Sequence, residues 1–155
     1  MAAHRYAVRL DWSGARGTGT TGYRAYGREH VLRAPGKPDI GGSADPQFHG
    51  DAAAWNPEEL LVGALSACHM LWFLHLAAEA GVVVTAYADA AEGVMETTPD
   101  GSGRFTGVTL RPAVTTRDPA EPAHLTALHA AAHERCFVAN SMNFPVVITP
   151  ASESA

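Results

Sequence analysis

The residues from Leu60 to Ala78 contain no Asp, Glu, Lys or Arg, and this uncharged run constrains the fold more than any other feature. It reads LLVGALSACHMLWFLHLAA, which is long enough to be a transmembrane candidate. Its polar residues, its acidic flanks (Glu58, Glu59 and Glu79) and the lack of flanking Lys or Arg argue against a membrane span. A helix that is apolar on all sides and lies outside a membrane should be buried on all sides. In so small a protein, this predicts burial by a second subunit as well as by the chain's own sheet.

The segment before this run has the pattern of a helix start. Asn56 can serve as the N-cap, Pro57 suits the first helical position, and Glu59 completes a capping-box arrangement. Glycine is common directly after a helix, and Gly81 follows the apolar run. We therefore expect a helix from Pro57 to Ala80.

The rest of the chain has the patterns of strands, turns and one further helix. The residues from Ala34 to Trp55 are rich in Pro, Gly, Asp and Ser and predict a long ordered loop, and TTPDGSG predicts a hairpin loop. The order is β-β-α-β-β-α-β, which predicts a single α+β domain over residues 1–155. The predicted strands are Tyr6–Trp12, Thr20–Arg33, Val82–Met95, Phe105–Thr116 and Phe144–Thr149, and the second helix is Pro122–Cys136.

Composition excludes several classes of protein. Hydrophobic residues make up 46% of the chain and charged residues 17%, which is typical of a globular protein. The net charge of −5 disfavours a nucleic-acid partner, because phosphate binding needs clustered Lys and Arg. The N-terminal residues MAAHRYAVRLDW lack the apolar run of a secretory signal. We expect a cytoplasmic protein with no nucleic-acid and no membrane partner.

The chain has two cysteines, Cys68 and Cys136. Cys68 lies far past the N-cap, and burial among apolar residues would raise its pKa and make it an inert core thiol. Cys136 ends the second helix and precedes the segment FVANSMNFP, so we expect it to be accessible and mobile. Two distant cysteines are more often unrelated free thiols than a transient catalytic disulfide. Residue patterns alone leave both interpretations open.

Histidines provide a second candidate chemistry. His129, His133 and Cys136 stand at helical spacing i, i+4 and i+7, which could present three zinc ligands. Without a CxxC or HExxH context, the favoured interpretation is a half-exposed face of an alanine-rich helix, and we expect no metal. His69 and His75 are expected to be hydrogen-bonded core histidines.

Several segments together resemble the OsmC/Ohr family, the osmotically inducible and organic-hydroperoxide-resistance proteins. They are NPEELLVGALSAC (Asn56–Cys68), AGVVVTAYADAAEG (Ala80–Gly93) and HERCFVANSMNFPV around the second cysteine, with GSADPQFHGD marking a divergent subgroup. The resemblance spans nearly the whole chain. It implies antiparallel sheets with two main helices, in an intertwined homodimer with central buried helices and active sites at the subunit interface.

The resemblance also implies an activity, the thiol-dependent reduction of organic hydroperoxides in a stress response. In that scheme Cys68 looks like the peroxidatic cysteine and Cys136 like the resolving one. A sulfenic acid on Cys68 would condense with Cys136 to a disulfide. A small dithiol or lipoyl-type thiol would then reduce the pair, with no cofactor. Glu58 matches the family glutamate that orients a catalytic arginine.

The resemblance leaves two candidates for the cation that activates Cys68, namely Arg16 in SGARG and His49 in FHG, where the subgroup is expected to have arginine. Glu58 raises a geometric question. On one straight helix, Glu58 and Cys68 would lie about 15 Å apart along the axis and differ in direction by roughly 80°. We expect either a break in the helix at Gly63 or a glutamate that acts across the dimer.

Two other functions remain open. The segment CFVANS lacks a proline expected after the second cysteine, and His49 replaces an expected arginine. Both departures fit an OsmC-like protein that binds a small molecule or a metal and has weak or no peroxidase activity. A buried structural dimer with inert thiols is the other alternative. If the chain is a peroxidase, an apolar pocket would favour alkyl hydroperoxides, and its candidate lining residues are Leu71, Trp72, Phe73 and Met142.

Overall fold

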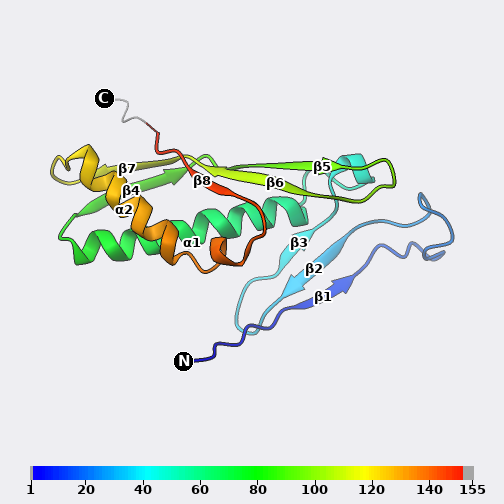
Figure 1. The fold of residues 1–155 in the computed structure, drawn as a ribbon. Coiled ribbons are helices and arrows are strands. Elements are labelled where there is room, and N and C mark those ends of the chain that lie inside the picture. Colours follow the sequence, from blue (N-terminus) through cyan, green and yellow to red (C-terminus); the bar gives the residue numbers. More distant parts are fainter. Residues whose placement is uncertain (1, 152–155) are drawn as a thin grey trace. The chain divides into compact units, whose positions relative to one another are not determined.

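The structure is a computed structural model that describes residues 2–151. Within them the α+β class with two main helices is confirmed, and the strands outnumber those expected from the sequence (Figure 1). The elements are β1 (Arg9–Trp12), β2 (His30–Arg33), β3 (Ile40–Gly42), η1 (Pro46–Phe48), α1 (Pro57–Glu79), β4 (Val84–Asp89), β5 (Glu92–Thr97), β6 (Gly103–Leu110), β7 (Pro112–Thr116), α2 (Pro122–Arg135), η2 (Ala139–Ser141) and β8 (Val146–Ile148).

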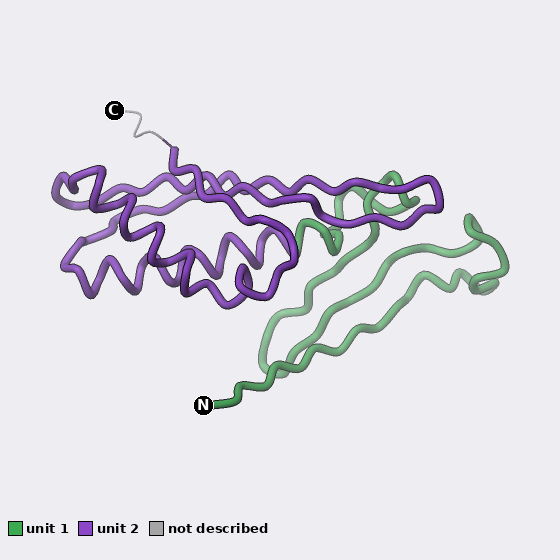
Figure 2. Tube along the Cα trace, viewed as in Figure 1, with its two compact units in different colours: residues 1–60 green, residues 61–155 purple. Residues whose placement is uncertain are grey.

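Contacts within the chain group it into two compact units, residues 1–60 and residues 61–155 (Figure 2). The boundary falls inside α1, one turn after its start. The N-terminal unit holds β1, β2 and β3, and the C-terminal unit holds the remaining strands and α2. The single domain expected over residues 1–155 stays a prediction.

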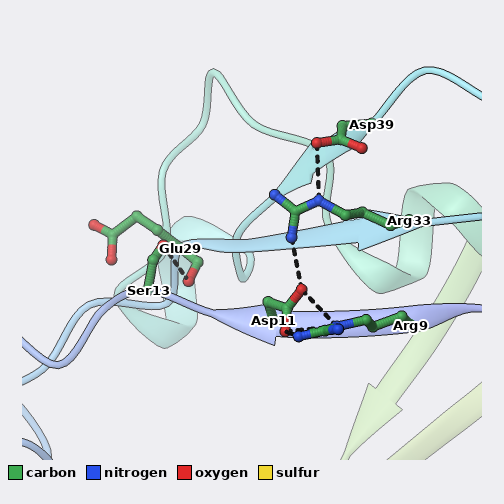
Figure 3. A network of polar contacts seen from close by, with 6 residues as sticks. All are labelled: Arg9, Asp11, Ser13, Glu29, Arg33 and Asp39. Carbon is green, nitrogen blue, oxygen red and sulfur yellow. Dashed lines mark hydrogen bonds and ion pairs between the residues drawn. The ribbon is translucent and has the colours of Figure 1, made fainter.

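The N-terminal unit contains an antiparallel three-stranded sheet in the order β1-β2-β3. An alternating chain of charges crosses its surface (Figure 3). Arg33 donates to Asp11 at 2.6 Å and to Asp39 at 3.0 Å, and Arg9 donates to Asp11 at 2.9 Å. These side chains are exposed, so each pair stabilises the sheet only slightly.

The strand expected over Thr20–Arg33 is wrong for most of its length, because β2 begins only at His30. The preceding backbone is held in turns by partners outside a strand ladder. The Trp12 indole N–H donates to the Gly27 carbonyl at 2.8 Å, and the Gly27 N–H donates to the Gly14 carbonyl at 2.8 Å. A side chain on Gly14 would collide with the Gly27 carbonyl, so this turn requires glycine there.

The predicted loop from Ala34 to Trp55 holds a short strand and a short helix. Within it, β3 pairs with β2, and η1 is capped by Asp45, whose carboxylate accepts the Gln47 N–H at 2.7 Å. The Ser43 N–H donates to the Trp55 carbonyl at 2.9 Å and joins the middle of the segment to its end. The loop is therefore ordered, as expected.

Helix α1 begins at the predicted residue, Pro57, and ends one residue before the predicted Ala80. Asn56 Oδ1 accepts the Glu59 N–H at 2.8 Å, and Glu59 Oε2 accepts the Asn56 N–H at 3.3 Å, which is a complete capping box. The last helical residue is Glu79, and Gly81 follows with φ of 74°, the left-handed conformation that ends many helices. The helix runs without interruption through Gly63, so the break considered there is absent.

The C-terminal unit contains a long hairpin that is divided in the middle. The expected strands Val82–Met95 and Phe105–Thr116 are each two strands, which pair as β4 with β7 and as β5 with β6. The ladder is interrupted at Arg111 and Pro112, since the Arg111 N–H donates to the Asp89 carboxylate at 2.6 Å and Pro112 has no N–H. Strand β8 adds to β6 in parallel (Figure 1).

Helix α1 buries one stripe at a spacing of four residues, made of Leu65, His69, Phe73 and Ala77. Leu65 packs in one apolar cluster with strand β6, and Phe73 packs in a second cluster with α2. The opposite stripe stays exposed, and Leu71 in it is 62% exposed. The chain alone thus does not bury α1 on all sides. The helix α1 is long and apolar enough to cross a bilayer. Core helices of soluble proteins can have the same length and composition.

Candidate active site

The two cysteines are neighbours in the structure, although 68 positions separate Cys68 and Cys136 in the chain. Both are free thiols; Cys68 is half-buried in α1, and Cys136 is only 1% exposed directly after α2. Burial, together with the adjacent Cys68 thiol, raises the pKa of the Cys136 thiol to about 11. The fold therefore provides one accessible thiol and one enclosed thiol beside it.

The expectation that Cys136 is accessible is wrong, and the segment that follows it explains why. FVANSMNFP folds back on itself through η2, and the Asn140 N–H donates to the Cys136 carbonyl at 2.9 Å. The Asn140 side chain also donates to the Glu134 carbonyl at 2.9 Å, which fixes the turn against the end of α2. The backbone amides of Ala139 and Val138 partly offset the effect of burial on the pKa of Cys136.

Two of the four residues expected to line an apolar pocket are in the core instead. Phe73 is fully buried against α2, and Met142 packs in the Leu65 cluster. Leu71 and Trp72 do line a shallow hollow of about 220 Å³, together with His75.

A buried pair of histidines joins α1 to α2. His69 Nε2 and His129 Nδ1 share a hydrogen bond of 3.0 Å, with the two rings inclined by only 9°. His129 also stacks on Phe73, with ring centroids 4.1 Å apart. Burial lowers the pKa of each histidine to about 4, so both are neutral at pH 7. The expectation of a hydrogen-bonded core histidine is confirmed for His69.

Other histidine predictions are wrong. His75 is exposed and lies 3.4 Å from Glu79, and His129 is 4% exposed where a half-exposed face was expected. The sequence contains a signal for the burial of His69, because His69 stands four residues from Leu65 and from Phe73 along α1. Among residues 2–151, no three His, Cys, Asp or Glu side chains are grouped as a metal would require, so the zinc arrangement of His129, His133 and Cys136 is not found.

The remaining predicted site residues lie within residues 1–60. Arg16 has a left-handed backbone and pairs with Glu29 at 2.8 Å, with both side chains more than half exposed. His49 also has a left-handed backbone, and its ring stands edge-on to Tyr23 at 5.0 Å. Their roles toward Cys68 stay predictions.

Glu58 lies in the first turn of α1 and is half-buried. Because the helix is continuous through Gly63, the axial separation of about 15 Å from Cys68 applies within one chain. Of the two arrangements considered, the one that remains for Glu58 is action across a dimer, and this stays a prediction.

The fold and the adjacent thiols define an α+β protein with a paired-cysteine site. The chain belongs to the OsmC-like protein family, whose model matches residues 49–151. An OsmC-like protein of unknown function from Vibrio cholerae is similar in structure at 32% identity, with a TM-score of 0.86 over 96% of this chain and 100% of that one.

Two more distant structures share the fold. A protein from Legionella pneumophila described as an organic hydroperoxide resistance protein OsmC has 20% identity and a TM-score of 0.70, over 97% of this chain and 100% of that one. The organic hydroperoxide resistance protein OhrB of Bacillus subtilis has 22% identity and a TM-score of 0.63, over 94% and 98% of the two chains. A search of curated protein sequences finds no match.

Proposed function

We propose that this protein is a thiol peroxidase that reduces organic hydroperoxides. The observation that carries the proposal is the adjacency of an accessible Cys68 to an enclosed Cys136. Membership of the OsmC-like family supports it, as do the names of the Legionella and Bacillus proteins that share the fold.

In the first step, the Cys68 thiolate attacks one oxygen of the hydroperoxide. The O–O bond breaks, the alkoxide takes a proton and leaves as an alcohol, and Cys68 becomes a sulfenic acid. Cys68 suits this role because it is the more accessible thiol. Cys136 keeps its proton at neutral pH, since its pKa is about 11, and so does not compete for the peroxide.

In the second step, the Cys136 sulfur attacks the Cys68 sulfur. The S–O bond breaks, the hydroxyl group leaves with the Cys136 proton as water, and a disulfide forms. The adjacency of the two thiols favours this step, because little movement of the chain is needed. A small dithiol or lipoyl-type thiol then reduces the disulfide by exchange and is itself oxidised.

A cation near Cys68 would lower the pKa of that thiol and hold the peroxide. Arg16 and His49 are the predicted candidates, with Glu58 as the group that orients the cation. Variants Arg16→Gln, His49→Gln and Glu58→Gln distinguish them, because only the group that acts on Cys68 shifts the pH profile of peroxide reduction. We also propose a cytoplasmic location, because thiols are kept reduced there.

We further propose that the protein is a homodimer that buries the exposed stripe of α1. The stripe consists mostly of small or apolar residues and lacks Asp, Glu, Lys and Arg, which makes it suited to close contact with another helix. Its members are Gly63, Ala64, Ala67, Leu71, His75 and Ala78.

Peroxide consumption in the presence of a dithiol tests the proposed activity. We expect cumene hydroperoxide to be reduced faster than hydrogen peroxide, and Cys68→Ser to abolish the reaction. With no dithiol present, Cys136→Ser should consume one hydroperoxide per chain and stop at the sulfenic acid. The control is Ala127→Ser, which places a hydroxyl on an exposed position of α2 outside the stripe and should leave the rate unchanged.

Equal slow rates in the wild type, Cys68→Ser and Cys136→Ser would overturn the peroxidase proposal. They would favour an OsmC-like binding protein or a structural dimer with inert thiols. Thiol counting provides a second readout, since each hydroperoxide consumed by the reduced wild type should remove both thiols.

A further inference from the structure

A second concave site lies in the C-terminal unit, and neither Cys68 nor Cys136 lines it. It is a pocket of about 370 Å³ between the first half of α2, strand β7 and the segment Pro150–Ala151. Its volume falls within the range of pockets that hold small organic molecules. Pro112 and Val114 form one wall, and Leu125 forms part of another.

Only two of the side chains that line this pocket are polar, Thr126 and His129. The Thr126 hydroxyl already donates to the Pro122 carbonyl at 2.9 Å. His129 is 4% exposed and bonds to His69 through Nδ1. Its other nitrogen, Nε2, has no partner among the described residues, and it is not among the enclosed polar atoms. His129 Nε2 therefore faces the pocket.

The proton arrangement of the histidine pair decides what His129 offers to a ligand. Each neutral ring carries one N–H, and His69 Nδ1 is enclosed without a partner. If His129 donated to His69, that enclosed Nδ1 would carry an unpaired N–H, which is rarer in proteins than an unpaired acceptor. The favoured arrangement has the His69 Nε2–H donating to His129 Nδ1. His129 Nε2 then carries a proton and points a donor into the pocket.

The electrostatics of the pocket select against charged ligands. None of its lining residues has a charged side chain. The pKa of His129 is lowered to about 4 by burial, so at pH 7 the donor is a neutral imidazole and cannot balance a carboxylate. An ammonium group would find no acceptor on His129. A neutral ligand with an apolar body and an oxygen acceptor suits both the uncharged lining and the N–H donor of His129.

We propose that this pocket binds a small neutral molecule with an apolar body and one oxygen acceptor, held by the Nε2–H of His129. The site is independent of peroxide chemistry at Cys68 and does not rest on it. Its ligand class includes ketones, ethers and alcohols of about ten to fourteen heavy atoms, which a pocket of this volume accommodates.

Titration of 15N-histidine-labelled protein with 4-phenyl-2-butanone at pH 7 tests the proposal. Before ligand is added, the side-chain spectrum should show a protonated Nε2 and an unprotonated Nδ1 for His129. The ketone should shift the His129 Nε2 resonance with a Kd near or below about 1 mM, as expected for a ligand of this size. The matched ions 3-phenylpropanoate and 3-phenylpropylammonium should bind at least tenfold more weakly.

Two tryptophan substitutions on α2 provide the matched variants. Thr126→Trp fills the pocket from its wall and should weaken ketone binding at least tenfold, whereas Ala127→Trp lies on another side of the helix and should leave it unchanged. Ala151→Trp blocks the pocket from the opposite wall, in case Thr126→Trp does not fold.

Four results would overturn the proposal. They are an unprotonated Nε2 in the free protein, no shift of His129 at the solubility limit of the ketone, unchanged binding in the folded blocking variant, and carboxylate binding as tight as ketone binding.

Discussion

Protonation of either histidine in the pair between α1 and α2 is energetically unfavourable. His69 and His129 are both enclosed, and a proton on each would set donor against donor across the 3.0 Å contact. Two further groups act on the pair from neighbouring elements. His133 on α2 disfavours a charge on His69, and Asp89 on β4 favours a charge on either ring. Burial outweighs the carboxylate, since the pKa of each ring is lowered.

This lowered pKa predicts acid sensitivity. The pKa of each histidine is about 4 in the folded protein and 6.5 for an ordinary histidine, so the unfolded chain binds more protons between these values. The free energy of unfolding should therefore fall as pH decreases from 6.5 to 4, by up to about 5 kcal/mol for the pair. Urea unfolding at pH 7.0 and pH 5.0 measures it.

The variant His129→Phe keeps the stack on Phe73 and should reduce this pH dependence. The control His75→Phe changes an exposed histidine and should follow the wild type. An identical pH dependence in the wild type and His129→Phe would contradict the assignment.

At the scale of elements, Asp89 links α1 to the division of the long hairpin. Its carboxylate accepts the Ser66 hydroxyl at 2.5 Å and the Arg111 N–H at 2.6 Å. One side chain thus satisfies a helix hydroxyl and the backbone amide at which β6 passes into β7.

Asp89→Ala should lower the free energy of unfolding by about 2–3 kcal/mol, because it leaves two partly buried donors without their acceptor. Asp118→Ala is a matched control, since the Asp118 side chain is exposed and makes no hydrogen bond among the described residues. It should change stability by less than about 0.5 kcal/mol. Equal effects of the two substitutions in chemical denaturation would argue against the role of Asp89.

Local sequence predicts the elements whose ends are set by local bonds. The capping box at Asn56 and the left-handed Gly81 bound α1 through contacts within a few residues, and both were predictable. The division at Asp89 was not, because Arg111, 22 positions away, supplies the donor. Burial of Cys136 was also missed, since it depends on how η2 folds back on α2. In the candidate site, the two cysteines were identified, but their different exposure was not.

At the scale of the whole molecule, the proposed dimer would bury the exposed stripe of α1. Leu71→Glu would place a charge in the centre of the proposed contact between two copies, so it should convert the dimer to a monomer. Val94→Glu is the matched control, because Val94 is 54% exposed on β5 and outside the stripe. Light scattering coupled to size-exclusion chromatography measures the mass of each variant. A wild-type monomer, or an unchanged dimer in Leu71→Glu, would contradict the proposed interface.

Because Cys136 is enclosed, the reactivity of its thiol reports how often the turn after α2 opens. A thiol that is 1% exposed can be alkylated only when the turn after α2 lifts away from it. In the variant Cys68→Ser, iodoacetamide should label Cys136 at least a hundredfold more slowly than it labels the urea-unfolded chain. The labelling rate in dilute urea would then give the free energy of opening for that turn, without an introduced cysteine. Labelling of the native and unfolded chains at the same rate would mean that the turn is already open.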